Sequence, residues 1–103
     1  MVNRKKVAEN FVHNIKSDNI HQVILFGSVA RNEDNDDSDI DILIIADNYL
    51  EIEPQINEGI YNAIRDYGEL ISAHFMTPET FNKTRNYSFL TKVMKEGITL
   101  AWN

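Results

Sequence analysis

The chain has 103 residues, of which 43% are apolar and 25% charged, and its formal net charge is −6. These values are typical of one globular domain and exclude a disordered chain. Cysteine is absent, which excludes a disulfide framework and a thiolate zinc site. The acidic balance argues against strong nucleic-acid binding. No apolar run approaches the ~20 residues of a membrane span and no secretory signal is present, so we expect a cytoplasmic protein without a membrane partner.

The hydrophobic pattern predicts alternating helices and strands, without an internal repeat or linker. Pro54 fits the first turn of a helix, and Gly97 is a C-cap candidate. The segment after Gly97 is interpreted as either a final strand or a docked tail. The expected elements, in chain order, are a helix over residues 3–17, strands over 21–26 and 39–46, a helix over 52–67, a strand over 69–76, a short helix opened by 77–78 and a helix over 87–96. This order predicts a sheet with helices packed on it, of the α/β or α+β class.

Asp39 and Asp41 form the first candidate site. Side chains alternate along a strand, so both carboxylates point to one face, about 7 Å apart, while Ile40 and Ile42 point into the core. Converging carboxylates repel each other unless a cation lies between them. Carboxylate oxygens at this spacing suit Mg²⁺ together with substrate phosphates. The alternative is a polar strand edge that faces water.

Gly27 and Ser28 form the second candidate site. They follow a strand and precede a sequence compatible with a helix, so they present free backbone N–H groups to an anion. Gly27 would let a phosphate approach the backbone, and the Ser28 hydroxyl could donate to a phosphate oxygen. The alternative is an ordinary turn with a serine N-cap. Because a short connection joins the two strands, the two candidate sites should lie close together.

The stretch "GSVARNEDNDDSDIDILI" resembles the signature of the DNA polymerase beta-like nucleotidyltransferase superfamily. It is most similar to the minimal nucleotidyltransferases (MNT, the MntA-like antitoxin type), with G-S-x-A-R-G, a variable loop and then S-D-[IVL]-D. Ten residues separate Ser28 from Asp39. The matching positions are Gly27, Ser28, Ala30, Arg31, Ser38, Asp39 and Asp41.

The resemblance implies a single nucleotidyltransferase domain over residues 1–103, with a small mixed sheet and helices packed on it. It also implies that Asp39 and Asp41 bind Mg²⁺ and act in catalysis. Gly27, Ser28 and Ser38 would bind a nucleoside triphosphate, with ATP as the expected one. Arg31 would orient a phosphate or brace the acidic loop.

Two positions depart from the family pattern. Asn32 replaces a glycine, and asparagine tolerates the left-handed backbone that such a turn uses. The family's third carboxylate belongs on the strand over 69–76, where the one acid is Glu69 at its start. The polar face of that strand offers Ser72 and His74, and a neutral His74 could accept a proton. Glu69 and His74 are therefore candidate catalytic residues, or else a strand-start charge and a half-buried polar residue.

Two functions remain open. The first is Mg²⁺-dependent transfer of a nucleoside monophosphate to a hydroxyl of a partner. By the resemblance, that partner is a HEPN-type toxin for which this chain is the antitoxin, or a second copy completes the site. The second is a weakly active or inactive nucleotide-binding subunit that acts by direct contact with its partner.

Overall fold

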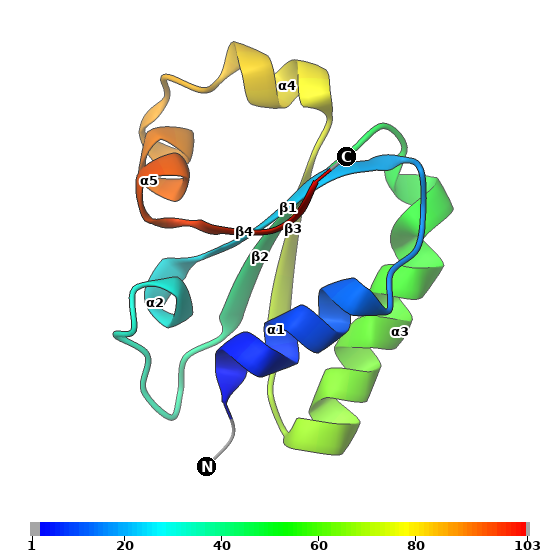
Figure 1. Ribbon diagram of the computed structural model, residues 1–103, viewed down its shortest axis with the longest axis vertical. Helices are drawn as coiled ribbons and strands as arrows, with labels where there is room; N and C mark the ends of the chain where they lie inside the picture. Colours follow the sequence, from blue (N-terminus) through cyan, green and yellow to red (C-terminus); the bar gives the residue numbers. More distant parts are fainter. Residues whose placement is uncertain (1–2, 103) are drawn as a thin grey trace.

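Helices and strands alternate through residues 3–102, the part of the chain that the computed structural model describes (Figure 1). The elements are α1 (Arg4–His13), β1 (Ile20–Phe26), α2 (Gly27–Ala30), β2 (Ile40–Ala46), α3 (Tyr49–Tyr67), β3 (Ile71–Met76), α4 (Pro78–Lys83), α5 (Ser88–Glu96) and β4 (Ile98–Trp102). No helix among these residues has the length and apolar character needed to cross a bilayer.

The four strands form one mixed sheet in the order β3-β2-β1-β4. β1 is antiparallel to both β2 and β4, whereas β2 and β3 are parallel. A parallel pair needs a crossover connection, which α3 supplies between β2 and β3. The mixed sheet with packed helices that the sequence predicts is therefore confirmed.

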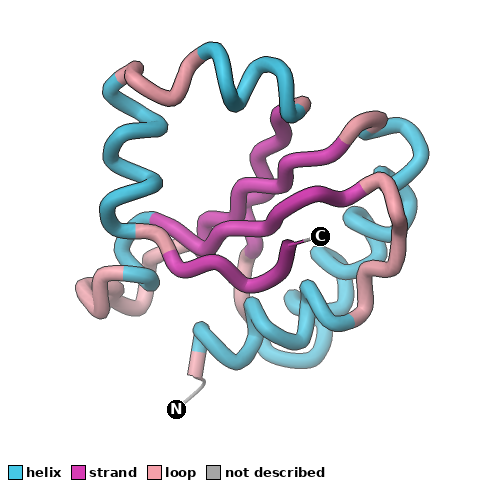
Figure 2. The backbone as a smooth tube through the Cα atoms, turned by 45° about the horizontal axis from the view of Figure 1, so that its top comes forward, coloured by secondary structure: helices cyan, strands magenta, loops and turns pink. Residues whose placement is uncertain are grey.

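Helices cover both faces of the sheet (Figure 2). α1 and α3 pack on the face to which Ile42 points, in a cluster that includes the buried residues Phe11 and Ile56. α4 and α5 cover part of the opposite face in a smaller cluster, whose buried members are Ile24, Leu43, Ile45, Phe81, Leu90 and Val93. Adjacent residues of β2 enter different clusters because strand side chains alternate. Asp41 is two residues before Leu43 in the same strand, so its side chain lies on the α4–α5 face, and Asp39 directly precedes the strand.

The two long helices have bounds that differ from the prediction. α1 ends at His13 rather than at residue 17. The side-chain Nδ2 of Asn14 donates to the Asn10 carbonyl at 3.0 Å. α3 begins at Tyr49 rather than at residue 52, because the Asn48 side chain caps it by accepting from Leu50 N at 3.0 Å. Pro54 consequently lies in the second turn and removes one helical hydrogen bond there.

The third strand also starts later than predicted, at Ile71 instead of residue 69. Gly68 ends α3 in the left-handed conformation, with φ of +68°, and Glu69 N donates to the Ala63 carbonyl at 3.3 Å. Glu69 is thus part of the helix cap and precedes the strand. The chain after Gly97 is a strand, β4, which resolves the alternative that the sequence left open.

Candidate functional site

Gly27 lies directly against Asp41. The antiparallel register pairs Phe26, the last residue of β1, with Asp41 in β2. Gly27 follows with φ of +77°, and a Cβ at this position would overlap the Asp41 carboxylate. A side chain is therefore excluded both by backbone conformation and by space. The two candidate sites of the sequence are adjacent, as their short connection predicts.

The electrostatics around Asp41 favour a cation. Its side chain is 30% exposed. Partial burial raises the pKa of the Asp41 carboxyl above its usual range, and the charge of Asp39 raises that pKa further, whereas His74 and Arg31 oppose the shift. Asp39 itself is exposed and precedes β2, which begins at Ile40. Two carboxylates whose mutual repulsion a cation would relieve are a donor set that fits Mg²⁺.

β3 brings Ser72 and His74 to the same face. The parallel register places Ser72 beside Asp41, and His74 Nε2 lies 3.9 Å from Asp41 Oδ1. The His74 ring also contacts Phe26, with ring centroids 5.4 Å apart. In residues 3–102, no three His, Asp or Glu side chains converge in an arrangement that could hold a metal ion. The protein supplies two carboxylates here, so further metal ligands would have to come from substrate or water.

The phosphate-binding candidates lie on a single helical turn. α2 spans Gly27–Ala30, and its N-cap is Phe26, so Ser28 does not act as the cap. The Ser28 hydroxyl has no hydrogen-bond partner among the described residues. Asn32 has a left-handed φ of 60°, as the sequence predicts for the position of the family's glycine. Four residues give a weak helix dipole, so any strong positive potential must come from side chains.

Arg31 links α2 to α5 and to the acidic loop. Its Nη1 donates to Glu96 Oε2 at 3.1 Å, and its Nε donates to Glu33 Oε2 at 3.4 Å. The hydrogen bond to Glu96, followed by that to Glu33, raises the pKa of the Arg31 guanidinium. These contacts join Arg31 to the acidic loop and to α5, and its role toward a phosphate stays a prediction.

The loop between α2 and β2 is held by a residue that the sequence pattern did not single out. Arg4 Nη1 donates to Asp34 Oδ2 at 2.8 Å, and Arg4 Nη2 donates to the Asp36 carbonyl at 3.3 Å. Within the loop, Ser38 Oγ accepts from Asn35 N at 2.9 Å. Arg4 and Asp34 are 30 residues apart, so their contact leaves no periodic signal in the sequence. Ser38 closes the loop just before Asp39.

Glu69 is engaged by the same arginine. Arg4 Nε donates to Glu69 Oε2 at 2.7 Å, and the two side chains are only 14% and 13% exposed. The hydrogen bond that Arg4 donates to Glu69, and then the one that it donates to Asp34, raise the pKa of the Arg4 guanidinium. Through Arg4, Glu69 therefore connects the segment before β3 to α1 and to the acidic loop, whereas the β3 side chains that face Asp41 are Ser72 and His74.

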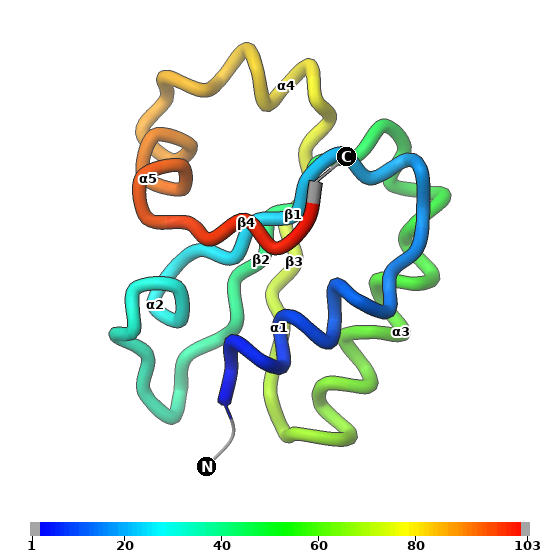
Figure 3. Tube along the Cα trace, in the orientation of Figure 1, coloured from blue at the N-terminus to red at the C-terminus, as the bar shows by residue number. Residues whose placement is uncertain are grey.

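A cavity of about 210 Å³ adjoins Gly27. Its lining comes from α5 and from the α2 segment, and these two helices are neighbours in the fold (Figures 1 and 3). Two phenylalanines and a valine form its apolar lining. Its charged lining comes from Arg31, which caps α2, and from Lys92 and Glu96 of α5. The lining residues are Phe26, Gly27, Arg31, Phe89, Lys92, Val93 and Glu96.

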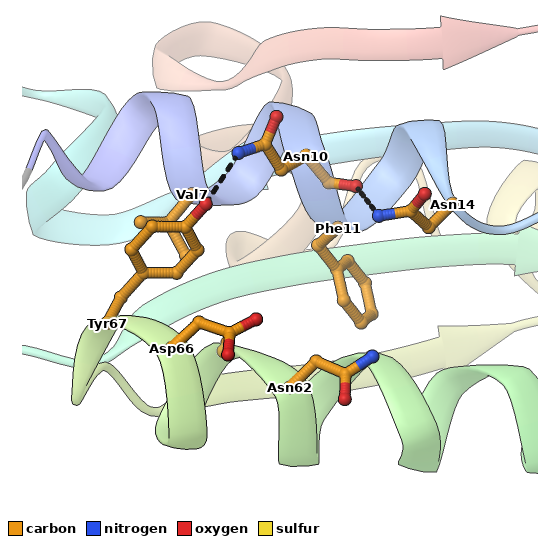
Figure 4. Close-up of a pocket in the computed structure, with 9 residues that line it drawn as sticks. Val7, Asn10, Phe11, Asn14, Asn62, Asp66 and Tyr67 are labelled. Carbon is orange, nitrogen blue, oxygen red and sulfur yellow. Dashed lines mark hydrogen bonds between the residues drawn. The ribbon is translucent and has the colours of Figure 1, made fainter.

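A second cavity, of about 140 Å³, lies between α1 and α3 on the other side of the sheet. Figure 4 shows its polar side chains and two hydrogen bonds among the residues drawn. Asn10 Nδ2 donates to the Tyr67 hydroxyl at 3.1 Å, and Asn14 Nδ2 donates to the Asn10 carbonyl at 3.0 Å. This groove contains none of the predicted site residues.

Comparison with known proteins agrees with this geometry. Residues 5–102 match the family described as "Polymerase beta, Nucleotidyltransferase". A candidate protein adenylyltransferase of Methanocaldococcus jannaschii is 36% identical over 102 residues, which cover 96% of this chain and 99% of the relative. The crystal structure of a toxin–antitoxin with AMP-PNP matches 99% of this chain and 75% of its own, with a TM-score of 0.60 and 20% identity.

A candidate nucleotidyltransferase from Sulfolobus solfataricus matches equally well, with a TM-score of 0.60 and 20% identity over 94% of this chain and 81% of its own. The mutant MntA–HpeT toxin–antitoxin structure has a TM-score of 0.61 and 18% identity over 99% of this chain and 75% of its own. These structural likenesses show the fold. With the family match over nearly its whole length, the chain belongs to the polymerase beta nucleotidyltransferase family.

Proposed function

We propose that the protein is a Mg²⁺-dependent nucleotidyltransferase that moves the adenylyl group of ATP to a hydroxyl of a protein partner. The observation that carries this proposal is the contact between Gly27 and the Asp41 carboxylate. It joins a backbone segment that a phosphate can approach to a carboxylate pair that favours a cation. A solvated acidic loop would not require this contact.

The proposed reaction is an in-line displacement at the α-phosphorus of ATP. The oxygen of the acceptor hydroxyl forms a new bond to that phosphorus, the bond to the bridging oxygen of the β-phosphate breaks, and pyrophosphate leaves. The hydroxyl proton passes to a base. His74 Nε2 lies 3.9 Å from Asp41 Oδ1, so neutral His74 is our candidate for that base, with a water molecule as the alternative.

Asp39 and Asp41 would hold Mg²⁺, which when bound neutralises phosphate charge and lowers the barrier to displacement. Gly27 and Ser28 would bind the triphosphate through backbone and hydroxyl donors. Arg31 and Ser38 would hold the acidic loop in position, since each is hydrogen-bonded to a loop residue. We assign Glu69 a structural role because Arg4 already occupies its carboxylate.

The choice of ATP and of a protein acceptor rests on the relatives. The archaeal relative carries the name of a protein adenylyltransferase, and a structural neighbour is a toxin–antitoxin with AMP-PNP. We infer that this chain is the antitoxin of a similar pair and modifies its HEPN-type toxin. A chain this short leaves little surface for an acceptor site, so the partner or a second copy would complete it.

One observation favours a second function, that of an antitoxin that binds nucleotide and partner without transfer. The β3 residue beside Asp41 is Ser72, where the family places a third carboxylate. A serine does not supply the basic oxygen that activates an acceptor hydroxyl at neutral pH. On this alternative, Asp39 and Asp41 still bind Mg²⁺ and nucleotide, but the partner is neutralised by contact alone.

An assay with ATP labelled at the α-phosphate separates the two functions. The chain is incubated with Mg²⁺, labelled ATP and the product of the adjacent gene. Label on that product, lost in Asp39→Asn and Asp41→Asn but kept in the loop variant Asp37→Asn, supports transfer. Neutralisation of the toxin without label contradicts transfer and supports the binding function.

A further inference from the structure

We propose that the cavity between α2 and α5 holds the terminal phosphates of the nucleoside triphosphate, with the Lys92 ammonium as their counter-charge. This inference rests on the proposed function and extends it, because it assigns to α5 a role in selecting a triphosphate over a monophosphate. None of the sequence motifs includes a residue of α5.

The position of the cavity is the first argument. Gly27 forms part of its lining and also contacts the Asp41 carboxylate. A triphosphate whose α-phosphate lies beside Asp41 therefore extends past Gly27 with its remaining phosphates. The cavity volume of about 210 Å³ is below the ~300 Å³ at which pockets for whole ligands begin, so the space suits part of a nucleotide.

The charges of the lining are the second argument. Arg31 is already bonded to Glu96 and Glu33, so its charge is largely balanced. Lys92 lines the same cavity and forms no ion pair with any described residue. An unpaired cation beside a phosphate-binding backbone, in a chain of net charge −6, is the feature that an anionic ligand would use.

The third argument concerns the strength of that interaction. The single turn of α2 contributes little dipole, so it cannot balance the charge of two terminal phosphates. A lysine interacts with phosphate as a flexible point charge and needs no rigid geometry.

The test compares Lys92→Gln with Lys95→Gln. Both lysines lie exposed on α5, but Lys95 does not line the cavity. Calorimetric titrations with Mg²⁺ use α,β-methylene-ATP, pyrophosphate and AMP as ligands. We expect Lys92→Gln to weaken the first two roughly tenfold and AMP less than twofold, Lys95→Gln to change none, and Lys92→Arg to retain most of the affinity.

Equal effects of Lys92→Gln and Lys95→Gln would overturn the inference. So would a loss for AMP as large as that for the triphosphate analogue, because the cavity would then hold the base or sugar. If the wild-type chain binds no analogue with Mg²⁺, the inference and the nucleotide site proposed above both fail. Analogue binding that depends on Asp41 but not on Lys92 overturns the inference alone.

Discussion

Arg4 and Glu69, which are 65 positions apart, form a hydrogen-bonded ion pair at 2.7 Å that fixes the first turn of α1 to the segment between α3 and β3. The same guanidinium bonds Asp34 at 2.8 Å, in the loop that leads to Asp39. One arginine thus connects three segments, which are α1, the segment before β3 and the loop that leads to Asp39. The position of Asp39 depends on this connection, because Asp39 itself lies outside the regular strand.

Replacing Arg4 by alanine should cost about 1 kcal/mol of unfolding free energy, since two partly shielded pairs are lost. It should also raise the Mg²⁺ concentration needed for half-maximal nucleotide binding, because the loop before Asp39 is released. Lys6→Ala, on the exposed side of the same helix, is the control and should change neither. If Glu69→Gln lowers turnover while Arg4→Ala leaves Mg²⁺ dependence unchanged, Glu69 is catalytic and our structural assignment is wrong.

Gly27→Ala should abolish nucleotide binding as well as lower stability. The left-handed φ of +77° costs a non-glycine residue roughly 1–2 kcal/mol, and the new Cβ would displace the Asp41 carboxylate. Gly68→Ala is the matched control, because Gly68 has φ of +68° and no atom within 4 Å of its would-be Cβ. Thermal melts should show a loss of stability for both variants, at least as large in Gly27→Ala because of the added overlap with Asp41. Binding of an ATP analogue should be lost in Gly27→Ala alone; retained binding there would contradict the proposed phosphate site.

Mg²⁺ should stabilise the wild-type fold through Asp41. At ten times its dissociation constant, a ligand bound only by the folded state adds about 1.4 kcal/mol to the unfolding free energy. Asp41→Asn should lose this increment, and without Mg²⁺ it should melt no lower than wild type, since a partly buried charge beside Asp39 has been removed. Melting curves with and without MgCl₂ measure both effects. Asp37→Asn is the control, because it removes the same single charge from the loop. A full Mg²⁺ response in Asp41→Asn would refute the metal site.

The Arg4–Asp34 pair should make stability depend on acid pH. The Arg4 hydrogen bond lowers the pKa of Asp34 below its ordinary value of 3.8. The folded state therefore favours the charged carboxylate, so the stabilisation is complete above the unfolded pKa and disappears as the pH falls through the lower folded pKa. Asp34→Asn should be less stable than wild type at pH 7, and the difference should shrink below pH 3.8. Urea unfolding from pH 7 to pH 2.5 checks this, and a constant difference would contradict it.

The sequence predicts the sheet and the central part of the site because both depend on short-range patterns. Strand alternation predicts the face on which Asp41 lies, and the short connection from Gly27 predicts the contact with Asp41; Asp39 precedes the strand. The left-handed Asn32 also follows from the chemistry of a single residue. The start of the third strand is not predicted correctly, because Glu69, where the strand pattern begins, belongs to the helix cap at Gly68.

The contacts of Arg4 and Lys92 could not be predicted in this way. Arg4 is adjacent to two lysines, and its pairing with Glu69 depends on how α1 crosses the sheet. Lys92 occupies an ordinary exposed position on an amphipathic helix. Its proximity to Gly27 arises from the path of the chain through α4 and α5 across the sheet, which no local pattern encodes.

The two apolar clusters on opposite faces of the sheet give the molecule two layers of unequal local stability. α4 and α5 are held by the smaller cluster, so this layer should open at a lower free energy than α1 and α3, without global unfolding. In amide hydrogen exchange, the protons of α5 should therefore exchange sooner than those of α3. A nucleotide that bridges Gly27 and Lys92 would slow exchange in α5 specifically, so part of its binding free energy would be spent in ordering the second layer of the fold.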